Sequence, residues 1–189
     1  MSQDAVKVAQ KSPQVLSESI SARSRIFTVQ AQHLRFSNGT EVQYERLLGS
    51  TSGAVLIIPL LQNGNLLLIR EYGAGVGRYE LGFPKGKIDP GEGWLEAAIR
   101  ESQEEVGYLP ATVEHLDAVS LAAGYMTHRT HIILATDLTP NIAQGDEPEP
   151  LEVIEWPLQE WKALLQHPEF TEGRAYAALM LVLQKQGVI

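Results

Sequence analysis

The sequence predicts an α+β protein in which a mixed β-sheet is packed between helices, a sandwich-like α/β/α arrangement, with an N-terminal antiparallel strand pair in front of it. Two pairs of strand-like segments, each around an Asn-Gly turn signal, fill the first part of the chain. A glycine-rich loop and a helix follow, and then strands, a short helix and a final amphipathic helix. With 189 residues, 44% of them hydrophobic, the chain is long enough for one domain with a sizeable core.

The first expected strands cover residues 25–36 and 41–48, and the second pair covers 54–61 and 65–72. The signals Asn38-Gly39 and Asn63-Gly64 stand between the partners. Periodicity alone does not distinguish the continuous apolar runs of the second pair from helices, but their length and flanking turns favour strands covered on both faces. Residues 1–24 have little periodicity, so we expect a tail or arm there and a single domain over residues 25–189.

The remaining elements follow from glycine, proline and apolar spacing. Residues 73–92 predict a long loop with a short strand near 79–81, and residues 93–106 a helix that ends at Gly107. We expect strands near 112–122, 129–136 and 151–156, and helices over 157–166 and 171–186. The segment 145–150, GDEPEP, reads as an acidic, turn-rich loop.

Composition excludes several classes of protein. There is no cysteine, so disulfides, thiolate nucleophiles and zinc-thiolate sites are excluded, and any metal is held by oxygen or imidazole. The five histidines form no ligand pattern. A formal net charge of -8 argues against binding to nucleic acid by general attraction. No apolar run approaches a membrane span or a signal peptide, and we therefore expect a cytoplasmic protein.

The helix expected over residues 93–106 concentrates carboxylates on one face. Glu101 and Glu105 are four residues apart and share that face, with Glu104 beside them. Such a cluster is repulsive unless a cation lies among the carboxylates, and Arg100 is spaced to pair with Glu104, while Glu96 is spaced to pair with Arg100. One reading is a solvated acidic helix. The other, which we favour, is a divalent-metal site for phosphate chemistry, with Mg²⁺ as the metal and Mn²⁺ as a substitute.

Seven residues at fixed spacing carry a family resemblance. They are Gly86, Glu92, Arg100, Glu101, Glu104, Glu105 and Gly107. Such a match has a chance of about 10⁻⁸ per start position at usual residue frequencies. The stretch resembles the Nudix box at all seven fixed positions and departs from it at Ser102 and Tyr108, where bulky aliphatic residues are usual. Flanking segments resemble the ADP-compounds hydrolase (NudE type) branch, related to ADP-ribose pyrophosphatase, over residues 22–185.

The resemblance implies a Nudix fold and the metal-dependent hydrolysis of the pyrophosphate bond of ADP-linked compounds. The substrates it implies are ADP-ribose, short diadenosine polyphosphates and NADH, with AMP among the products. Carried over by position, Glu101 and Glu105 are metal ligands, Glu104 is a third, and the backbone carbonyl of Lys85 or Gly86 is a further ligand. Glu92 and Arg100 are expected to orient these carboxylates from the second coordination sphere. Arg100 and Glu104 are also expected to be catalytic residues.

Relatives of this branch take their general base from a mobile acidic loop after the helix, which here makes Glu147 and Glu149 the candidates and Glu152 a weaker one. The alternative interpretation is that this acidic segment is a solvent-exposed turn without a catalytic role. Substrate-binding residues implied in the same way are Arg70, Glu80, Arg46 and Tyr125. Arginine matches phosphate with its planar guanidinium.

The downstream Pro-Gly pair usual in ADP-ribose pyrophosphatases is replaced by Ala123-Gly124, which favours broad use of ADP-linked substrates over strict ADP-ribose specificity. The N-terminal strands over residues 25–50 and the resemblance together predict a homodimer. Two alternatives stay open: a sugar-nucleotide pyrophosphatase such as a GDP-mannose hydrolase, and a non-catalytic Nudix domain that senses a nucleotide.

Overall fold

The computed structural model describes residues 11–50, 52–145 and 147–189, and it divides into two compact units. The N-terminal unit holds residues up to 49 together with 122–127, and the main unit holds residues 50–121 and 128–189. The boundary expected at residue 25 therefore falls inside the N-terminal unit rather than between the two units. In the described ranges, no helix is both long and apolar enough to cross a membrane.

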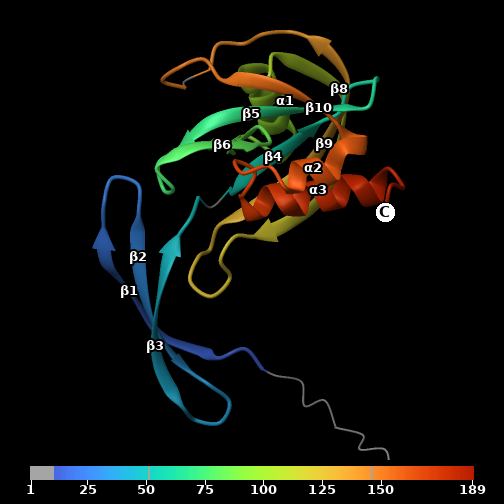
Figure 1. The fold of residues 1–189 in the computed structure, drawn as a ribbon. Coiled ribbons are helices and arrows are strands. Elements are labelled where there is room, and N and C mark those ends of the chain that lie inside the picture. Colours follow the sequence, from blue (N-terminus) through green and yellow to red (C-terminus); the bar gives the residue numbers. More distant parts are fainter. Residues whose placement is uncertain (1–10, 51, 146) are drawn as a thin grey trace, which may run out of the picture. The chain divides into compact units, whose positions relative to one another are not determined.

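The N-terminal unit is built on an antiparallel sheet of three strands in the order β1-β2-β3 (Figure 1). These are β1 (Gln14–Arg23), β2 (Thr28–Arg35) and β3 (Glu41–Leu48). The expected pair corresponds to β2 and β3, and Gly39 adopts the positive φ of 86° that the turn between them requires.

The expectation of a tail or arm over residues 1–24 is wrong from residue 14 onward, where β1 pairs with β2 along its length. Residues 1–10 lie outside the described ranges. The strand was missed because its side chains are almost all exposed, so no buried face imposes an alternation of apolar and polar residues on the sequence.

Among its described residues, the main unit contains two sheets and three α-helices (Figure 1). The larger sheet, in the order β7-β4-β9-β8, consists of β7 (Lys85–Lys87), β4 (Ala54–Pro59), β9 (Arg129–Pro140) and β8 (Tyr108–Ser120). The smaller sheet, in the order β10-β5-β6, consists of β10 (Glu152–Pro157), β5 (Asn65–Gly73) and β6 (Arg78–Gly82). The helices are α1 (Trp94–Glu105), α2 (Trp161–Leu165), which follows a 3₁₀ turn, and α3 (Gly173–Lys185). The larger sheet is mixed because β4 and β9 are parallel and its other pairs antiparallel.

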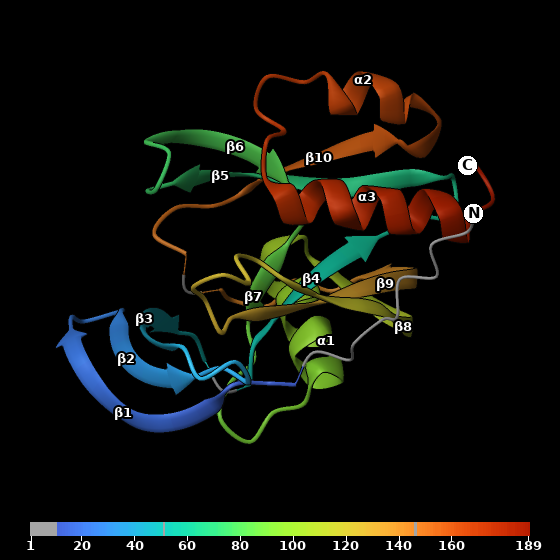
Figure 2. The ribbon, with the colours of Figure 1, turned by 90° about the horizontal axis from the view of Figure 1, so that it is seen from below.

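Strand β4 is buried on both faces, which settles its assignment as a strand. Val55 and Ile57 pack in a cluster with Ala97 and Ala98 of α1. The alternate residues of β4 pack in a second cluster with α3 and the smaller sheet. Figure 2 shows α1 and α3 on opposite sides of this sheet. The predicted class, a mixed sheet packed between helices, is confirmed.

The site-bearing helix α1 ends where the sequence predicts. Gly107 follows its last turn with φ 76°, a backbone conformation that favours glycine. Ser102, at one of the two unusual positions, is buried and its hydroxyl donates to the carbonyl oxygen of Tyr108 at 2.8 Å. A small polar residue thus ties the helix to the start of β8.

Candidate active site

Arg100 of α1 holds three carboxylates in fixed positions. Its Nε and Nη2 donate to the two oxygens of Glu92, each at 3.0 Å, and its Nη1 donates to Glu101 at 2.7 Å and to Glu104 at 3.0 Å. The hydrogen bonds with Glu92, above all, raise the pKa of Arg100 and lower that of Glu92. The expected pair of Arg100 with Glu104 is confirmed. The expected pair of Glu96 with Arg100 is wrong.

The carboxylate of Glu96 instead accepts a hydrogen bond from the backbone N–H of Gly93 at 3.1 Å. That N–H lies at the start of α1 and has no partner within the helix. Glu96 therefore stabilises the end of the helix rather than the carboxylate network.

Glu105 is buried beneath β7. Its Oε2 accepts the backbone N–H of Lys85 at 2.7 Å, and burial raises its pKa to about 8. Gly86, which follows Lys85 in β7, lies so close to Glu101 that an added Cβ would be 1.8 Å from Oε1 of that carboxylate. Any side chain at this position would force the carboxylate of Glu101 to shift. The main chain of Lys85 and Gly86 therefore borders the two buried carboxylates, and ligation of a metal by a carbonyl of this strand stays a prediction.

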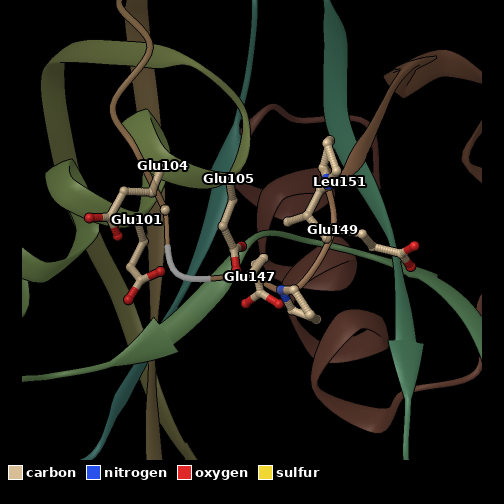
Figure 3. A pocket seen from close by; sticks show the side chains of 9 residues that line it. Glu101, Glu104, Glu105, Glu147, Glu149 and Leu151 are labelled. Atoms are coloured by element: carbon tan, nitrogen blue, oxygen red, sulfur yellow. The ribbon is translucent and has the colours of Figure 1, made fainter.

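The glutamates of α1 face a cavity of about 610 Å³. Its lining combines carboxylates with cations: Lys85, Gly86, Lys87, Asp89, Arg100, Glu101, Glu104, Glu105, Gln144, Gly145 and Glu147. A smaller cavity of about 250 Å³ adjoins it and is bordered by residues 147–151 (Figure 3). Glu147 lines both cavities, whereas Glu149 lines only the smaller one. In Figure 3, Glu147 lies toward Glu105, and the carboxylate of Glu149 points away from the α1 glutamates.

The chemistry of these groups fits a hard divalent cation. Within the described ranges, no three acidic or imidazole side chains already converge as a metal cage, because Arg100 lies between Glu101 and Glu104. The donors are nevertheless all carboxylate oxygens, and Glu101 and Glu105, which carry some of them, are buried. Gly86 lets the carboxylate of Glu101 lie close to the main chain of β7. Oxygen donors of this kind suit Mg²⁺, Mn²⁺ or Ca²⁺.

Two further predicted residues pair with each other outside these cavities. Arg70 donates to Glu169 at 2.9 Å and also to Glu152, and these carboxylates raise its pKa. Arg70 lines none of the cavities described here, and neither does Glu152, the weaker candidate for the base. Nε and Nη1 of Arg70 are thus held by carboxylates, and binding of substrate by Arg70 stays a prediction.

Glu80 borders a third cavity, of about 590 Å³, which Lys85 also lines. Its carboxylate is held by Arg78 at 2.5 Å and by the hydroxyl of Thr171. These hydrogen bonds lower the pKa of Glu80 even though desolvation by burial, the largest single effect, raises it. Lys85 borders both this cavity and the one at α1, so the two cavities meet at this residue.

Arg46 and Tyr125 belong to the N-terminal unit. Nε of Arg46 donates to Gln30 at 2.8 Å, and the ring of Tyr125 is exposed. Their role in binding substrate stays a prediction.

The sequence predicted Lys85 only through its backbone carbonyl, and it missed the side chains of both lysines of β7 and Tyr79 of β6. Lys85 and Lys87 flank Gly86, and the two-residue period of a strand places both on one face. That spacing was a usable signal, and both residues line the cavity. Tyr79 gave no comparable signal, because its contact with Glu149, in which the phenol O–H donates at 2.5 Å, joins residues 70 positions apart.

The chain resembles known proteins over nearly its whole length. A family model described as NUDIX domain matches residues 51–179, and one described as NudE-type Nudix hydrolase N-terminal domain matches residues 13–46. The chain is 46% identical over 170 residues to ADP compounds hydrolase NudE of Escherichia coli (strain K12), covering 90% of this chain and 91% of that protein. It is 27% identical to an ADP-ribose pyrophosphatase of Bacillus subtilis (strain 168), covering 70% and 74% of the two chains.

A GDP-mannose pyrophosphatase of Yersinia enterocolitica is 29% identical, over 75% of this chain and 79% of that one. A solved structure, described as the crystal structure of ADP compounds hydrolase, superimposes with a TM-score of 0.88 at 44% identity. That match covers 96% of this chain and 99% of the other.

Proposed function

The chain belongs to the Nudix hydrolase family, and on that premise we propose that it hydrolyses the pyrophosphate bond of ADP-linked compounds and releases AMP with a phosphorylated product. ADP-ribose, short diadenosine polyphosphates and NADH are the candidate substrates. One observation carries the proposal: the α1 glutamates and Glu147, from a segment more than 40 positions later, line one cavity together with Lys85, Lys87 and Arg100. Carboxylates for a cation and cations for a diphosphate thus border the same space.

Glu101 and Glu105 would hold the divalent ion, with Glu104 beside them and Arg100 fixing the carboxylates from behind. When bound, such an ion neutralises phosphate oxygens and lowers the pKa of water. Nudix hydrolases generally use divalent metal ions, and we propose Mg²⁺, with Mn²⁺ as a substitute. The role of Arg100 in this arrangement is to hold the carboxylates, since its guanidinium already bonds to three of them.

Glu147 is the better placed of the two candidates for the general base. It lines both cavities beside the glutamates, while the carboxylate of Glu149 points away from them and accepts the hydroxyl of Tyr79 (Figure 3). A base must lie within reach of the proton that it accepts. We therefore assign to Glu147 the acceptance of the proton from the attacking water at its carboxylate.

The substrate would extend from the α1 cavity past Lys85 into the cavity bordered by Glu80. The Lys85 ammonium, 2.5 Å from Glu71, supplies a positive charge at the junction. Glu80 would accept a hydrogen bond from a sugar hydroxyl or an amine at the far end of the substrate.

The test is a panel of ADP-ribose, NADH, diadenosine triphosphate and GDP-mannose, assayed with Mg²⁺ and separately with a chelator. We expect turnover of the adenine compounds with the metal, release of AMP, and no turnover with the chelator. Preference for GDP-mannose would favour the sugar-nucleotide alternative. Binding without turnover of any member would favour a nucleotide sensor, an alternative that the retention of every box glutamate argues against. We further propose that the enzyme acts in the cytoplasm as a homodimer.

A further inference from the structure

The segment 147–150 has the sequence Glu-Pro-Glu-Pro, and this composition makes it stiff. Each proline fixes its own φ near −65°, and each also restricts the residue before it to extended conformations. All four residues are therefore constrained by local covalent geometry. A contact that anchors Glu149 consequently restricts the position of Glu147 as well.

Tyr79 supplies such a contact from β6. Its phenol O–H donates to Oε1 of Glu149 at 2.5 Å, and this hydrogen bond raises the pKa of Tyr79. The ring of Tyr79 is itself supported, because Tyr72 lies opposite it in the β5–β6 register and contacts it edge to face with centroids 5.5 Å apart. The anchor thus belongs to a sheet rather than to another loop.

The two carboxylates of the segment point in different directions. The carboxylate of Glu149 accepts the hydroxyl of Tyr79. Figure 3 shows Glu147 on the side of Glu105, and Glu147 borders both cavities. We propose that Tyr79 is a positioning residue: through Glu149 it holds the Glu-Pro-Glu-Pro segment so that Glu147 stays beside the glutamates of α1. The inference rests on the proposed function for Glu147 and assigns to Glu149 the role of an anchor instead of that of a base.

The test compares Tyr79→Phe, which removes only the donor and keeps the ring against Tyr72, with the wild type. Displacing a catalytic group by about an ångström costs up to about a hundredfold, so we expect a loss in kcat on the order of tenfold. KM for ADP-ribose and the affinity for Mn²⁺ measured by calorimetry should stay within about twofold, because Tyr79 lines neither cavity at α1. Tyr176→Phe is the control, since it also removes only a phenol donor, here to the carbonyl oxygen of Leu165 at 3.5 Å, and Tyr176 lines none of the cavities described above.

Substitutions of Glu149 separate an anchor from a base. Glu149→Ala should reproduce the loss seen with Tyr79→Phe, and the double variant should lose no more than either single one. Glu149→Gln keeps an oxygen that accepts the phenol hydroxyl, although the uncharged bond is weaker, so kcat should stay within about threefold of the wild type. If Glu149→Gln instead loses as much activity as Glu147→Gln, Glu149 is the base and the inference is overturned. Multiplying losses in the double variant would also overturn it.

Amide hydrogen exchange at Glu147 and Glu149, followed by NMR, tests the inference without any assay of activity. Exchange at both amides should be faster in Tyr79→Phe than in the wild type and in Tyr176→Phe. Unchanged exchange would show that Tyr79 does not hold the segment. If the wild type hydrolyses none of the ADP compounds, the proposed function fails, and the exchange measurement still decides whether Tyr79 positions Glu147.

Discussion

The contact between Gly86 and Glu101 leaves no room for even one methyl group. A Cβ at residue 86 would lie 1.8 Å from Oε1 and 2.0 Å from Cδ of Glu101. Because Glu101 is bonded to Arg100 and faces the cavity, a side chain at residue 86 would push its carboxylate away from that position. The glycine at position 86 is therefore explained by the short distance between β7 and Glu101 of α1, and not by the flexibility of a loop.

Gly86→Ala should therefore lower both metal affinity and turnover. The added methyl group would displace the carboxylate of Glu101, a proposed ligand of the divalent ion. We expect this displacement to reduce kcat/KM at least about tenfold. Calorimetry with Mn²⁺ and steady-state kinetics measure the two effects. Gly173→Ala, at the start of α3, is the control, because a Cβ there meets no atom within 4 Å. Equal behaviour of the two variants would contradict the argument from steric contact.

Glu105→Gln should abolish most of the turnover and leave the fold intact. The change removes an anionic ligand without altering size, and mutation of a group of this kind costs about a hundredfold or more. The fold should survive because burial disfavours the charged form of Glu105, as its pKa of about 8 indicates. Circular dichroism and thermal unfolding in chelator check the fold. Near wild-type turnover at saturating Mg²⁺ would remove Glu105 from the ligand set.

At the scale of elements, the strands β8 and β9 carry a histidine pair that the sequence did not reveal. Nε2 of His115 lies 2.9 Å from Nδ1 of His131, and the two residues belong to neighbouring strands. Burial, followed by the nearby His115 and Arg129, lowers the pKa of His131 below its ordinary value of 6.5. The folded protein thus favours neutral His131.

This pair should make stability fall as the medium becomes acidic. The unfolded chain takes up a proton at His131 as pH falls through about 6.5, whereas the folded chain resists it, so the stabilisation is present above that pH and is lost below it. Unfolding temperatures measured between pH 7.5 and 5.5 should decrease less for His131→Gln than for the wild type. Parallel curves for the two proteins would show that His131 contributes nothing to the pH dependence.

The sequence predicted most elements because burial leaves a pattern. The alternating faces of β4, the end of α1 at Gly107 and the pair of Arg100 with Glu104 follow from local spacing, and all of them are confirmed. Strand β1 left no pattern because both of its faces are exposed. The contacts of Tyr79 with Glu149 and of Arg70 with Glu169 depend on tertiary structure, so no spacing along the chain could have predicted them.

At the scale of the whole molecule, the three-stranded sheet of the N-terminal unit and its β1–β2 turn carry several exposed large apolar side chains. Large apolar side chains that are at least 45% exposed lie on it, namely Val15, Ile20, Ile26, Phe27 and Tyr44. Exposed apolar patches of this kind are typical of sites of association. The prediction of a homodimer through the N-terminal strands is consistent with this surface.

Sedimentation equilibrium at micromolar concentration should give twice the mass of the chain. Phe27→Glu, which places a charge at the turn between β1 and β2, should shift the equilibrium toward the monomer. Thr112→Glu, at an exposed position of β8 in the main unit, is the matched control. It should leave the equilibrium between monomer and dimer unchanged. A wild-type protein that sediments as a monomer would refute the prediction.

The two faces of β4 have a consequence for how such a chain can change over time. Residues one position apart on that strand contact different layers, one bearing α1 and its glutamates and the other bearing α3. Ile57 and Ile58 are therefore adjacent in sequence but pack in separate clusters, so a substitution at one need not disturb the packing of the other. Substitutions on the α3 side can change the stability of the protein, while the packing beneath α1 and its glutamates is kept.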